Sequence, residues 1–163
     1  MDLPLIRIIN SGNLSTLQAV CRFGFSDFGI PKSGFQDSIS AQLANWLVGN
    51  ERFNTLIESY ANYFEFEVIN DCSMGVQGAC SEIRINGQSV SLDQAHHLRV
   101  NDRIELFNNT HGAILYLAMA GGFTATEVLG STATDIANGL GGLNGLPFTS
   151  KDMLKGSKFN MPR

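Results

Sequence analysis

The sequence predicts a mainly β domain, of barrel or sandwich-like architecture, with one clear helix over about residues 38–48. Three observations predict this fold class. Apolar and polar residues alternate over much of residues 64–106, an Asn-Gly pair separates two alternating segments, and a single stretch combines helical spacing with a cap and a stop. A chain of 163 residues with 44% apolar residues suits one domain that buries roughly 70% of its unfolded-chain surface, which excludes a disordered or fibrous chain.

The first predicted element is a buried strand over residues 5–9, which an Asn-Ser-Gly turn ends. No period holds from residue 13 to residue 36, where three glycines and a proline interrupt the chain. Long irregular segments are uncommon in compact domains and are commonly functional. This segment is therefore predicted to be an ordered loop or part of a site, with a segment that only wraps around the domain as the alternative.

The helix is predicted from three signals that agree. Asp37 stands before the first turn as a cap, apolar residues recur with helical spacing, and a Gly-Asn pair follows at residues 49–50. The apolar stripe consists of Ile39, Leu43, Trp46, Leu47 and Val48.

Downstream of the helix the pattern predicts strands. Apolar residues at positions 64, 66 and 68 alternate with Glu65 and Glu67, which predicts one face in the core and one in water. Asn86-Gly87 predicts a tight hairpin, and the alternation continues over residues 98–106. Residues 114–119 predict a strand buried on both faces, residues 123–137 a short helical turn at most, and residues 140–147 a glycine-rich loop.

Composition and charge narrow the function classes. Charged residues make up 16% of the chain, where about 25% is usual, so part of the surface is expected to be covered in an oligomer. The net charge of -4 and the lack of a basic stripe argue against nucleic acid. The longest apolar stretch is far shorter than the roughly 20 residues of a membrane helix. With three widely spaced cysteines expected to be packing residues, these features predict a cytoplasmic protein that does not associate with a membrane.

No standard catalytic or metal-binding signature is present. The glycine-rich loop lacks the Gly-Lys-Ser/Thr of a phosphate-binding Walker loop, so it is structural or binds phosphate only through backbone N–H groups. His96 and His97 are adjacent and would point to opposite faces of a strand, and His111 lies in a predicted turn. No metal site is predicted.

Polar side chains without a periodic pattern are the remaining candidates for a site. Asp37 is most simply a helix cap, and Asn45 could be an exposed helix residue. Glu58 lies in an apolar stretch, and if it points inward it must be paired, with Arg22 or Lys32 as the natural counter-ion. The group consists of Thr16, Gln18, Arg22, Lys32, Ser33, Asp37, Asn45, Asn50 and Glu58.

These residues belong to motifs that occur in one order along residues 5–154: Thr16-Leu17-Gln18 with Arg22 and Gly24, Gly29-Ile30-Pro31-Lys32-Ser33-Gly34 with Asp37, Ala44-Asn45-Trp46-Leu47-Val48-Gly49-Asn50 with Glu58, Val76-Gln77-Gly78-Ala79, Tyr116-Leu117-Ala118 to Gly121-Gly122, Leu129-Gly130-Ser131 with Thr134-Asp135, and Gly141-Gly142-Leu143 with Gly145. In this order they resemble the biotin-dependent carboxyltransferase family. Members include allophanate hydrolase subunit 2, the carboxyltransferase part of urea amidolyase and the C subunit of bacterial ATP-dependent 5-oxoprolinase.

The resemblance implies a cyclophilin-like β-barrel and a subunit of an ATP-dependent 5-oxoprolinase, which opens the cyclic amide 5-oxoproline to glutamate. It implies ATP, with Mg, shared with a partner subunit that resembles a kinase inhibitor or allophanate hydrolase subunit 1. Two alternatives stay open. One is a regulatory or assembly protein that binds a kinase-inhibitor-type partner, and the other is an allophanate or urea carboxyltransferase component, for which biotin would be the cofactor.

The resemblance also implies roles for individual residues. Arg22, Asp37 and Glu58 would be catalytic, because the reaction needs cations near developing charge and a carboxylate that handles a proton. The substrate- and phosphate-binding residues would be Gln18, Lys32, Ser33, Gly34, Asn45, Asn50, Gly121, Gly122 and Ser131.

The chain also departs from the family pattern. Ala19 and Cys21 stand where an acidic residue and a glycine are usual, and Thr132 and Leu146 stand where arginines are common. Residues 1–163 are predicted to be one carboxyltransferase-family domain that is incomplete, since members are about twice as long and the missing half would leave strand edges free to pair with another chain. Because phosphate chemistry depends on charged groups, these departures predict weak catalysis or none by the chain alone.

Overall fold

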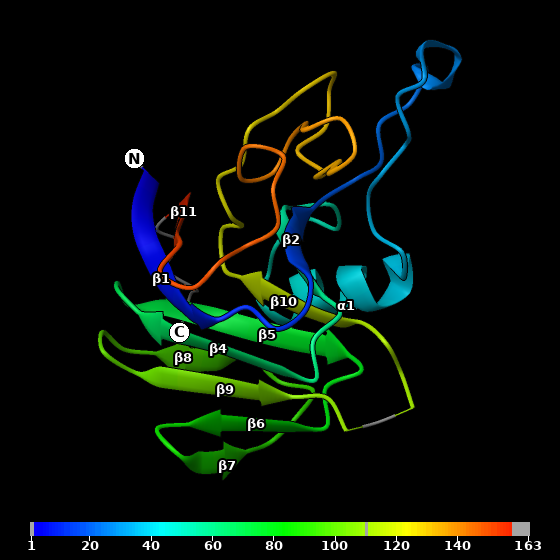
Figure 1. Cartoon of the computed structure of the whole chain (residues 1–163). Coiled ribbons are helices and arrows are strands. Elements are labelled where there is room, and N and C mark those ends of the chain that lie inside the picture. The colour runs from blue at the N-terminus through cyan, green and yellow to red at the C-terminus, as the bar shows by residue number, and fades with distance from the viewer. Residues whose placement is uncertain (1, 110, 158–163) are drawn as a thin grey trace.

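The structure, a computed structural model, describes residues 2–109 and 111–157. Antiparallel strands form two sheets, and one α-helix, α1 (Ser38–Leu47), lies outside them (Figure 1). The mainly β fold class with a single clear helix is thereby confirmed. No helix in the described part of the chain is long and apolar enough to cross a membrane.

The larger sheet has six strands in the order β11-β1-β4-β9-β6-β7, and each neighbouring pair is antiparallel. The strands are β1 (Asp2–Asn10), β4 (Tyr63–Val68), β6 (Glu82–Ile85), β7 (Gln88–Val90), β9 (Arg103–Phe107) and β11 (Met153–Ser157).

The smaller sheet has five strands in the order β2-β3-β10-β5-β8, again antiparallel. The strands are β2 (Ser15–Gln18), β3 (Leu56–Ser59), β5 (Cys72–Gly78), β8 (His96–Leu98) and β10 (Leu115–Met119). No strand is shared between the two sheets in the described residues, so strands β11, β7, β2 and β8 form their outer edges.

The main hydrophobic core joins the two sheets. Phe64 and Phe66 of β4 lie in the same buried cluster as Met74 of β5 and Leu117 of β10. In β10 the intervening residues Tyr116 and Ala118 face the opposite way and form a second cluster with α1. Both faces of β10 are therefore buried, as the continuous apolar run predicts.

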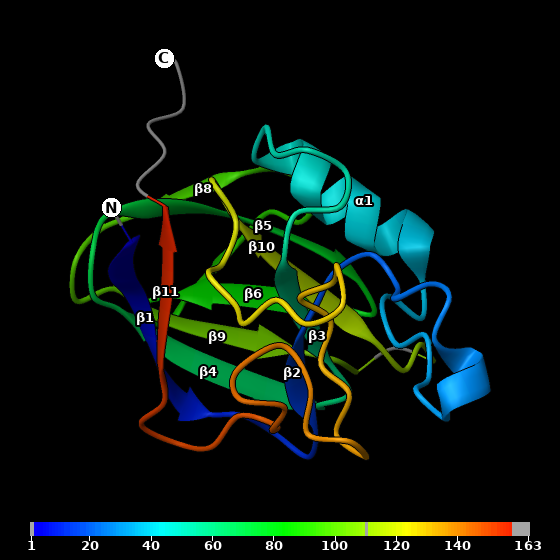
Figure 2. The ribbon, with the colours of Figure 1, turned by 90° about the horizontal axis from the view of Figure 1, so that it is seen from above.

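The helix contacts the smaller sheet through its smallest residues, which corrects the expected role of its apolar stripe. Ala41 and Ala44 are fully buried, whereas Ile39 and Trp46 are exposed. A Cβ atom on Gly75 of β5 would lie 2.8 Å from the Ala44 carbonyl oxygen, so the helix backbone lies close to the sheet. Ile39, Leu43 and Trp46 of the apolar stripe are therefore exposed, whereas Val48 is buried against the smaller sheet. Figure 2 shows α1 lying outside this sheet.

Several local predictions are confirmed. Ile85 and Gln88 pair across a two-residue turn in which Asn86 and Gly87 have φ angles of 52° and 80°. The strand predicted over residues 5–9 is β1.

Other predictions are corrected by tertiary contacts. The aperiodic segment 13–36 contains β2 and a short 3-10 helix, η1 (Ser26–Phe28). Every residue of β2 is buried, so no apolar–polar alternation marks this strand in the sequence. Glu65, expected to face water, is buried and forms an ion pair with Arg103. By contrast, residues 123–137 contain turns and isolated bridges, which agrees with the expectation of a short helical turn at most.

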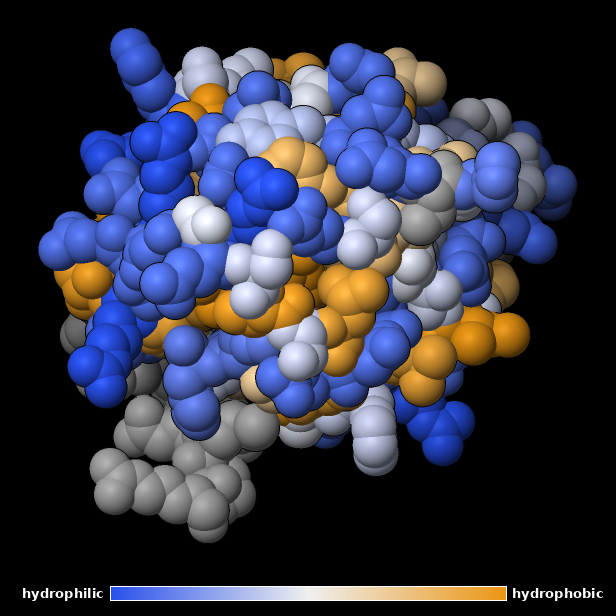
Figure 3. All heavy atoms as spheres, turned by 90° about the horizontal axis from the view of Figure 1, so that it is seen from below, coloured by the Kyte–Doolittle hydropathy of each residue, from blue (hydrophilic) through white to orange (hydrophobic). Residues whose placement is uncertain are grey.

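The surface of the larger sheet is mixed in polarity. Seen from below the orientation of Figure 1, hydrophobic residues lie in a band bordered by hydrophilic ones (Figure 3). Ile85 and Val90 of the β6–β7 hairpin pack against the main core and are only partly buried.

We expect Asp37→Ala to lower the free energy of unfolding by about 1 kcal/mol, because Asp37 is the N-cap of α1. Its carboxylate accepts hydrogen bonds from the backbone N–H groups of Ile39 and Ser40, both at 3.1 Å. Urea denaturation measures the change. Asp27→Ala, on the exposed η1, is the matched control and should have almost no effect; equal losses in both variants would contradict the capping role.

Candidate functional site

A row of polar side chains crosses the smaller sheet on the face covered by α1. Thr16 of β2 pairs with Glu58 of β3, Glu58 with Tyr116 of β10, and Tyr116 with Gln77 of β5. Directly opposed residues on neighbouring strands project to the same face of a sheet. We call these four residues the polar row.

Glu58 is the central acidic group of the polar row, and it is almost fully buried. Its Oε2 atom accepts hydrogen bonds from the Tyr116 hydroxyl at 2.8 Å and from the backbone N–H of Gln36 at 3.0 Å. The Tyr60 side chain, two residues further along the chain, also interacts with this carboxyl group. Hydrogen-bond donors therefore compensate the burial of Glu58 in place of a cation.

The segment 34–37 is attached to the polar row through three backbone donors. The N–H of Gly34 donates to Gln18 Oε1 at 3.1 Å, that of Gln36 to Glu58, and that of Asp37 to the Tyr116 hydroxyl at 2.8 Å. Gly34 has a φ angle of 91°, and a Cβ atom there would lie 2.8 Å from the Cys21 backbone nitrogen, so the position requires glycine. The irregular segment thus lies directly over the acidic group.

Burial raises the pKa of Glu58 above its ordinary value of 4.5, although the hydrogen bonds from Gln36, Tyr116 and Tyr60 oppose this shift. The pKa of Tyr116 is also raised, mainly by burial. Tyr60 differs from Tyr116 because its side chain is exposed at the edge of the cluster, where burial and the Glu58 charge raise its pKa. Burial therefore favours the protonated form of the Glu58 carboxyl group more than water does, and the partly exposed Tyr60 interacts with the same group.

The raised pKa predicts a pH-dependent stability that Glu58→Gln should remove. The folded state binds the Glu58 proton more tightly than the unfolded state, so this stabilisation is fully present below pH 4.5 and is lost as the pH rises through the folded pKa. Urea denaturation over a pH series gives the free energy of unfolding of each protein, and the value for Glu58→Gln is subtracted from the wild-type value. We expect the difference to fall above pH 4.5; a difference that rises there would contradict the assigned direction. The pKa of the nearby Asp37 is lowered, chiefly by a hydrogen bond from Ser40. Asp37 is present in both proteins, so its contribution to the pH dependence cancels in the difference.

Arg22 lies in a different environment, and the expectation that it or Lys32 pairs with Glu58 is wrong. The buried guanidinium donates to the backbone carbonyls of Val128 at 2.9 Å, Ala133 at 2.7 Å and Ser131 at 3.3 Å. Its Nη1 atom has no hydrogen-bond partner in the described residues. Arg22 therefore holds the segment 128–133 against the N-terminal segment.

Lys32 and Ser33 directly precede Gly34 in the chain, and the Lys32 carbonyl accepts a hydrogen bond from the Arg22 backbone N–H at 2.6 Å. Lys32 is exposed, with its Nζ atom 6.0 Å from the ring centroid of Phe23. Ser33 is half-buried with a φ angle of 53°. Ser131, on the Arg22 side, donates to the Val20 carbonyl at 2.6 Å.

A third group of predicted residues gathers at the C-terminal end of α1. Asn45 is buried and donates to the carbonyls of Asn54 at 3.0 Å and Arg52 at 3.3 Å. Asn50 donates to Asn45 Oδ1 and accepts from the Gly121 N–H at 2.7 Å. These amide groups tie the loop after α1 to the Gly121-Gly122 turn.

Apart from Lys32 and Ser33, the predicted site residues fall into three clusters. Glu58 belongs to the polar row, and Gln18, Gly34 and Asp37 lie around it. Arg22 and Ser131 belong to the 128–133 contact. Asn45, Asn50, Gly121 and Gly122 form the amide cluster.

Sequence reasoning missed the tyrosines of the site. Tyr116 stands inside an apolar run, where it resembles a core residue, and Tyr60 stands in an apolar stretch. One signal was available: Tyr60 is two residues after Glu58, and residues i and i+2 of a strand share a face.

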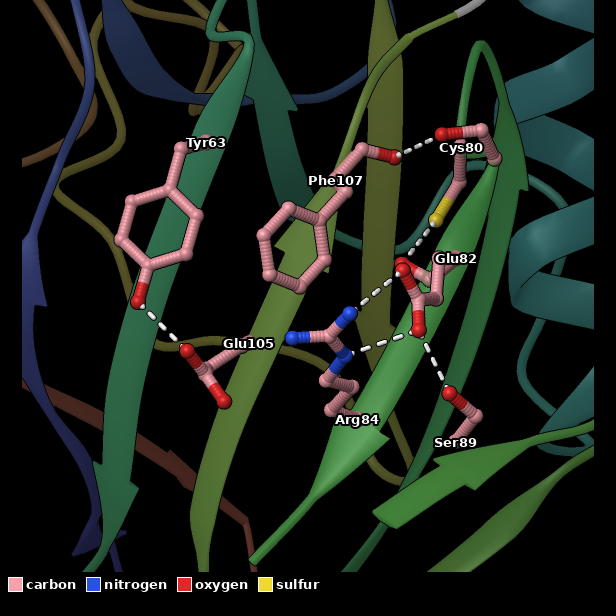
Figure 4. A network of polar contacts seen from close by, with 8 residues as sticks. Tyr63, Cys80, Glu82, Arg84, Ser89, Glu105 and Phe107 are labelled. Carbon is pink, nitrogen blue, oxygen red and sulfur yellow. Dashed lines mark hydrogen bonds and ion pairs between the residues drawn. The ribbon is translucent and has the colours of Figure 1, made fainter. Parts of the chain in front are cut away.

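Other polar groups in the structure satisfy one another. Figure 4 shows a network on β4, β6, β7 and β9 in which the Arg84 guanidinium contacts both Glu82 carboxylate oxygens and lies 4.7 Å from the Phe107 ring centroid. The network includes Tyr63, Cys80, Glu82, Arg84, Ser89, Glu105 and Phe107. The described residues contain no group of three or more His, Cys, Asp or Glu side chains that could hold a metal ion.

Comparison with known proteins assigns the family. Residues 28–162 match the family described as "Carboxyltransferase domain, subdomain A and B". The chain belongs to this carboxyltransferase family. The family predicted from the order of the sequence motifs is thereby confirmed.

Two relatives and one solved structure show the extent of the similarity. The chain is 32% identical over 150 residues to the C subunit of 5-oxoprolinase from Escherichia coli (strain K12), covering 92% of this chain and 48% of the relative. It is 28% identical to urea amidolyase of Lachancea kluyveri, covering 82% of this chain and 7% of that protein. The structure of Kluyveromyces lactis urea carboxylase matches with a TM-score of 0.86 and 27% identity, covering 94% of this chain and 14% of that one. The chain thus spans about half the length of the 5-oxoprolinase relative.

Proposed function

We propose that the chain is a component of a 5-oxoprolinase-type amidohydrolase, similar to the C subunit of that enzyme, and acts together with a partner subunit. The observation that carries this proposal is the buried Glu58 with its tyrosine partners under the segment 34–37, in a chain 32% identical to a 5-oxoprolinase subunit. The name of that relative describes it as one subunit of an enzyme.

Glu58 and Tyr60 supply the proton-handling part of the proposed reaction. Opening a cyclic amide forms a bond between a water oxygen and the carbonyl carbon and breaks the bond from that carbon to nitrogen. One water proton passes through the Tyr60 hydroxyl to ionised Glu58, and the same route returns a proton to the leaving nitrogen. A pKa above the ordinary glutamate value makes the Glu58 carboxylate a stronger proton acceptor, and the protonated group can then return the proton.

The predicted phosphate-binding groups do not fit an ATP site made by this chain alone. The Gly34 and Gly121 N–H groups donate to Gln18 and Asn50, and the Gly122 N–H donates to the Met119 carbonyl. Two nitrogens of the Arg22 guanidinium are likewise bound to backbone carbonyls. We therefore propose that ATP and Mg are bound mainly by the partner subunit.

Reconstitution tests the proposed function. We expect the chain, mixed with the other two subunits of a 5-oxoprolinase and ATP, to restore hydrolysis of 5-oxoproline, measured as glutamate released. Glu58→Gln should lower this rate at least about 100-fold, because a general acid–base contributes that much or more. Glu127→Gln, on the exposed loop after β10, is the control and should be unchanged. Failure both to restore hydrolysis and to bind either of the other subunits would overturn the proposal.

A carboxyltransferase role is the second candidate, because urea amidolyase and urea carboxylase also match most of this chain. It predicts transfer of a carboxyl group from biotin on a carrier domain to urea. A regulatory or assembly role with a kinase-inhibitor-type partner is the third, supported by Thr132 and Leu146 at positions where family members commonly carry arginine. Binding of such a partner without glutamate release or carboxyl transfer would favour it.

A further inference from the structure

We propose that α1 is the contact surface of a two-fold symmetric dimer of this chain, in which the helices of two copies pair antiparallel through Ile39, Leu43 and Trp46. This interaction is independent of the proposed function. It concerns the outward face of α1, on the opposite side of the helix from the polar row.

The pattern of exposed side chains is the first observation. Ile39, Leu43 and Trp46 are 71%, 45% and 73% exposed, although all three are large and apolar. Their spacing of four and then three residues places them in one stripe along the helix, as in the seam of two paired helices. The helix sequence SISAQLANWL contains no charged residue, so no like charges oppose each other when two copies meet.

The stripe is complementary to itself when reversed. Leu43 lies near the midpoint between Ile39 and Trp46, which are separated by about 10 Å along the helix at 1.5 Å per residue. In an antiparallel pair related by a two-fold axis, Leu43 meets Leu43 of the second copy, and Ile39 meets Trp46 of the second copy. A surface that matches itself in this way is what a two-fold interface requires.

Exposed phenylalanines lie beyond both ends of the helix. Residues 23–32 form an arm that stands on the same flank as α1 and beyond its N-terminal end (Figures 1 and 2), and Phe23 and Phe28 of this arm are exposed. Phe53 is exposed in the loop after the C-terminal end. Antiparallel pairing brings the arm of one copy to the end of the helix where Phe53 of the second copy lies.

The available area is close to what a stable dimer needs. The exposed parts of these six apolar side chains amount to on the order of 700 Å² per copy, against about 800 Å² per partner in a standard interface. The partly buried apolar residues of the β6–β7 hairpin are a weaker candidate, because Ile85 and Val90 already pack against the main core.

The single tryptophan of the chain makes this proposal directly measurable, because Trp46 lies in the proposed interface. Analytical ultracentrifugation over a concentration series should show a reversible monomer–dimer equilibrium. The Trp46 fluorescence emission should shift to longer wavelength on dilution, with the same midpoint, as the indole becomes exposed to water.

Variants locate the interface. Ile39→Ser should weaken dimerisation at least about tenfold in Kd, and Ile39→Ser combined with Trp46→Gln should leave a monomer. Both side chains are exposed, so the fold should be retained, which circular dichroism checks. Leu92→Ser and Val100→Ser replace other exposed apolar residues and should leave dimerisation unchanged.

Three results would overturn the proposal. The first is a wild-type chain that stays monomeric at all concentrations. The second is a dimer unaffected by the α1 variants. The third is a monomer whose Trp46 emission shifts only when another 5-oxoprolinase subunit is added, which would assign this face to a different protein.

Discussion

Replacing Arg22 by methionine is expected to lower the free energy of unfolding by about 3–5 kcal/mol, because the buried Ser131 and Ala133 carbonyls lose the guanidinium donor. The guanidinium joins the N-terminal segment to residues 128–133, more than 100 positions away in the chain. Methionine keeps much of the side-chain volume, so the loss measures hydrogen bonds more than packing. Urea denaturation followed by circular dichroism gives the value.

Lys32→Met is the matched control, because Lys32 is a cation in the same segment but its side chain is exposed. It should change the free energy of unfolding by less than about 0.5 kcal/mol. If the two variants lost similar stability, the effect would come from the charge of the segment, and the assigned role of Arg22 would be wrong.

Replacing Glu58 by alanine is expected to lower the free energy of unfolding by about 2–4 kcal/mol, because the substitution removes a buried hydrogen-bond acceptor and leaves a cavity. The Gln36 N–H and the Tyr116 hydroxyl would both lose their partner. Because these bonds attach the segment 34–37 to the sheet, hydrogen exchange of the Gln36 amide should also become faster.

The contrast between Glu58→Ala and Glu58→Gln separates hydrogen bonding from proton handling. The glutamine amide oxygen can still accept from Gln36 or Tyr116, so Glu58→Gln should lose less stability than Glu58→Ala. The reconstituted enzyme that contains Glu58→Gln should nevertheless hydrolyse 5-oxoproline far more slowly than the wild type. A glutamine variant that keeps full activity in the reconstituted enzyme would show that Glu58 is structural only.

Local features were predictable from the sequence. The Asp37 cap depends on residues within one helical turn, and the Asn86-Gly87 hairpin depends on two adjacent residues. The burial of both faces of β10 follows from its continuous apolar run. In each case the physical cause lies within a few positions of the residue concerned.

Long-range pairing was not predictable. A buried carboxylate near two cations suggests an ion pair, but carbonyls of the 128–133 segment occupy the Arg22 guanidinium, and a tyrosine 58 positions away donates to Glu58. The outward direction of Ile39 and Trp46 depends on the close approach of α1 to Gly75. Hydrophobic spacing locates a stripe on a helix, and the neighbouring sheet decides which side chains fit beneath it.

A titration of the Glu58 side chain tests most directly whether a buried carboxyl group with a raised pKa lies at the centre of this site. Carbon NMR of the labelled carboxyl carbon, with Glu58→Gln used for assignment, follows the group across the pH range. We expect its midpoint above 4.5, the ordinary value for glutamate, with a higher midpoint still in Tyr116→Phe, which lacks the donated hydrogen bond. A midpoint at or below 4.5 in the wild-type chain would contradict the buried site.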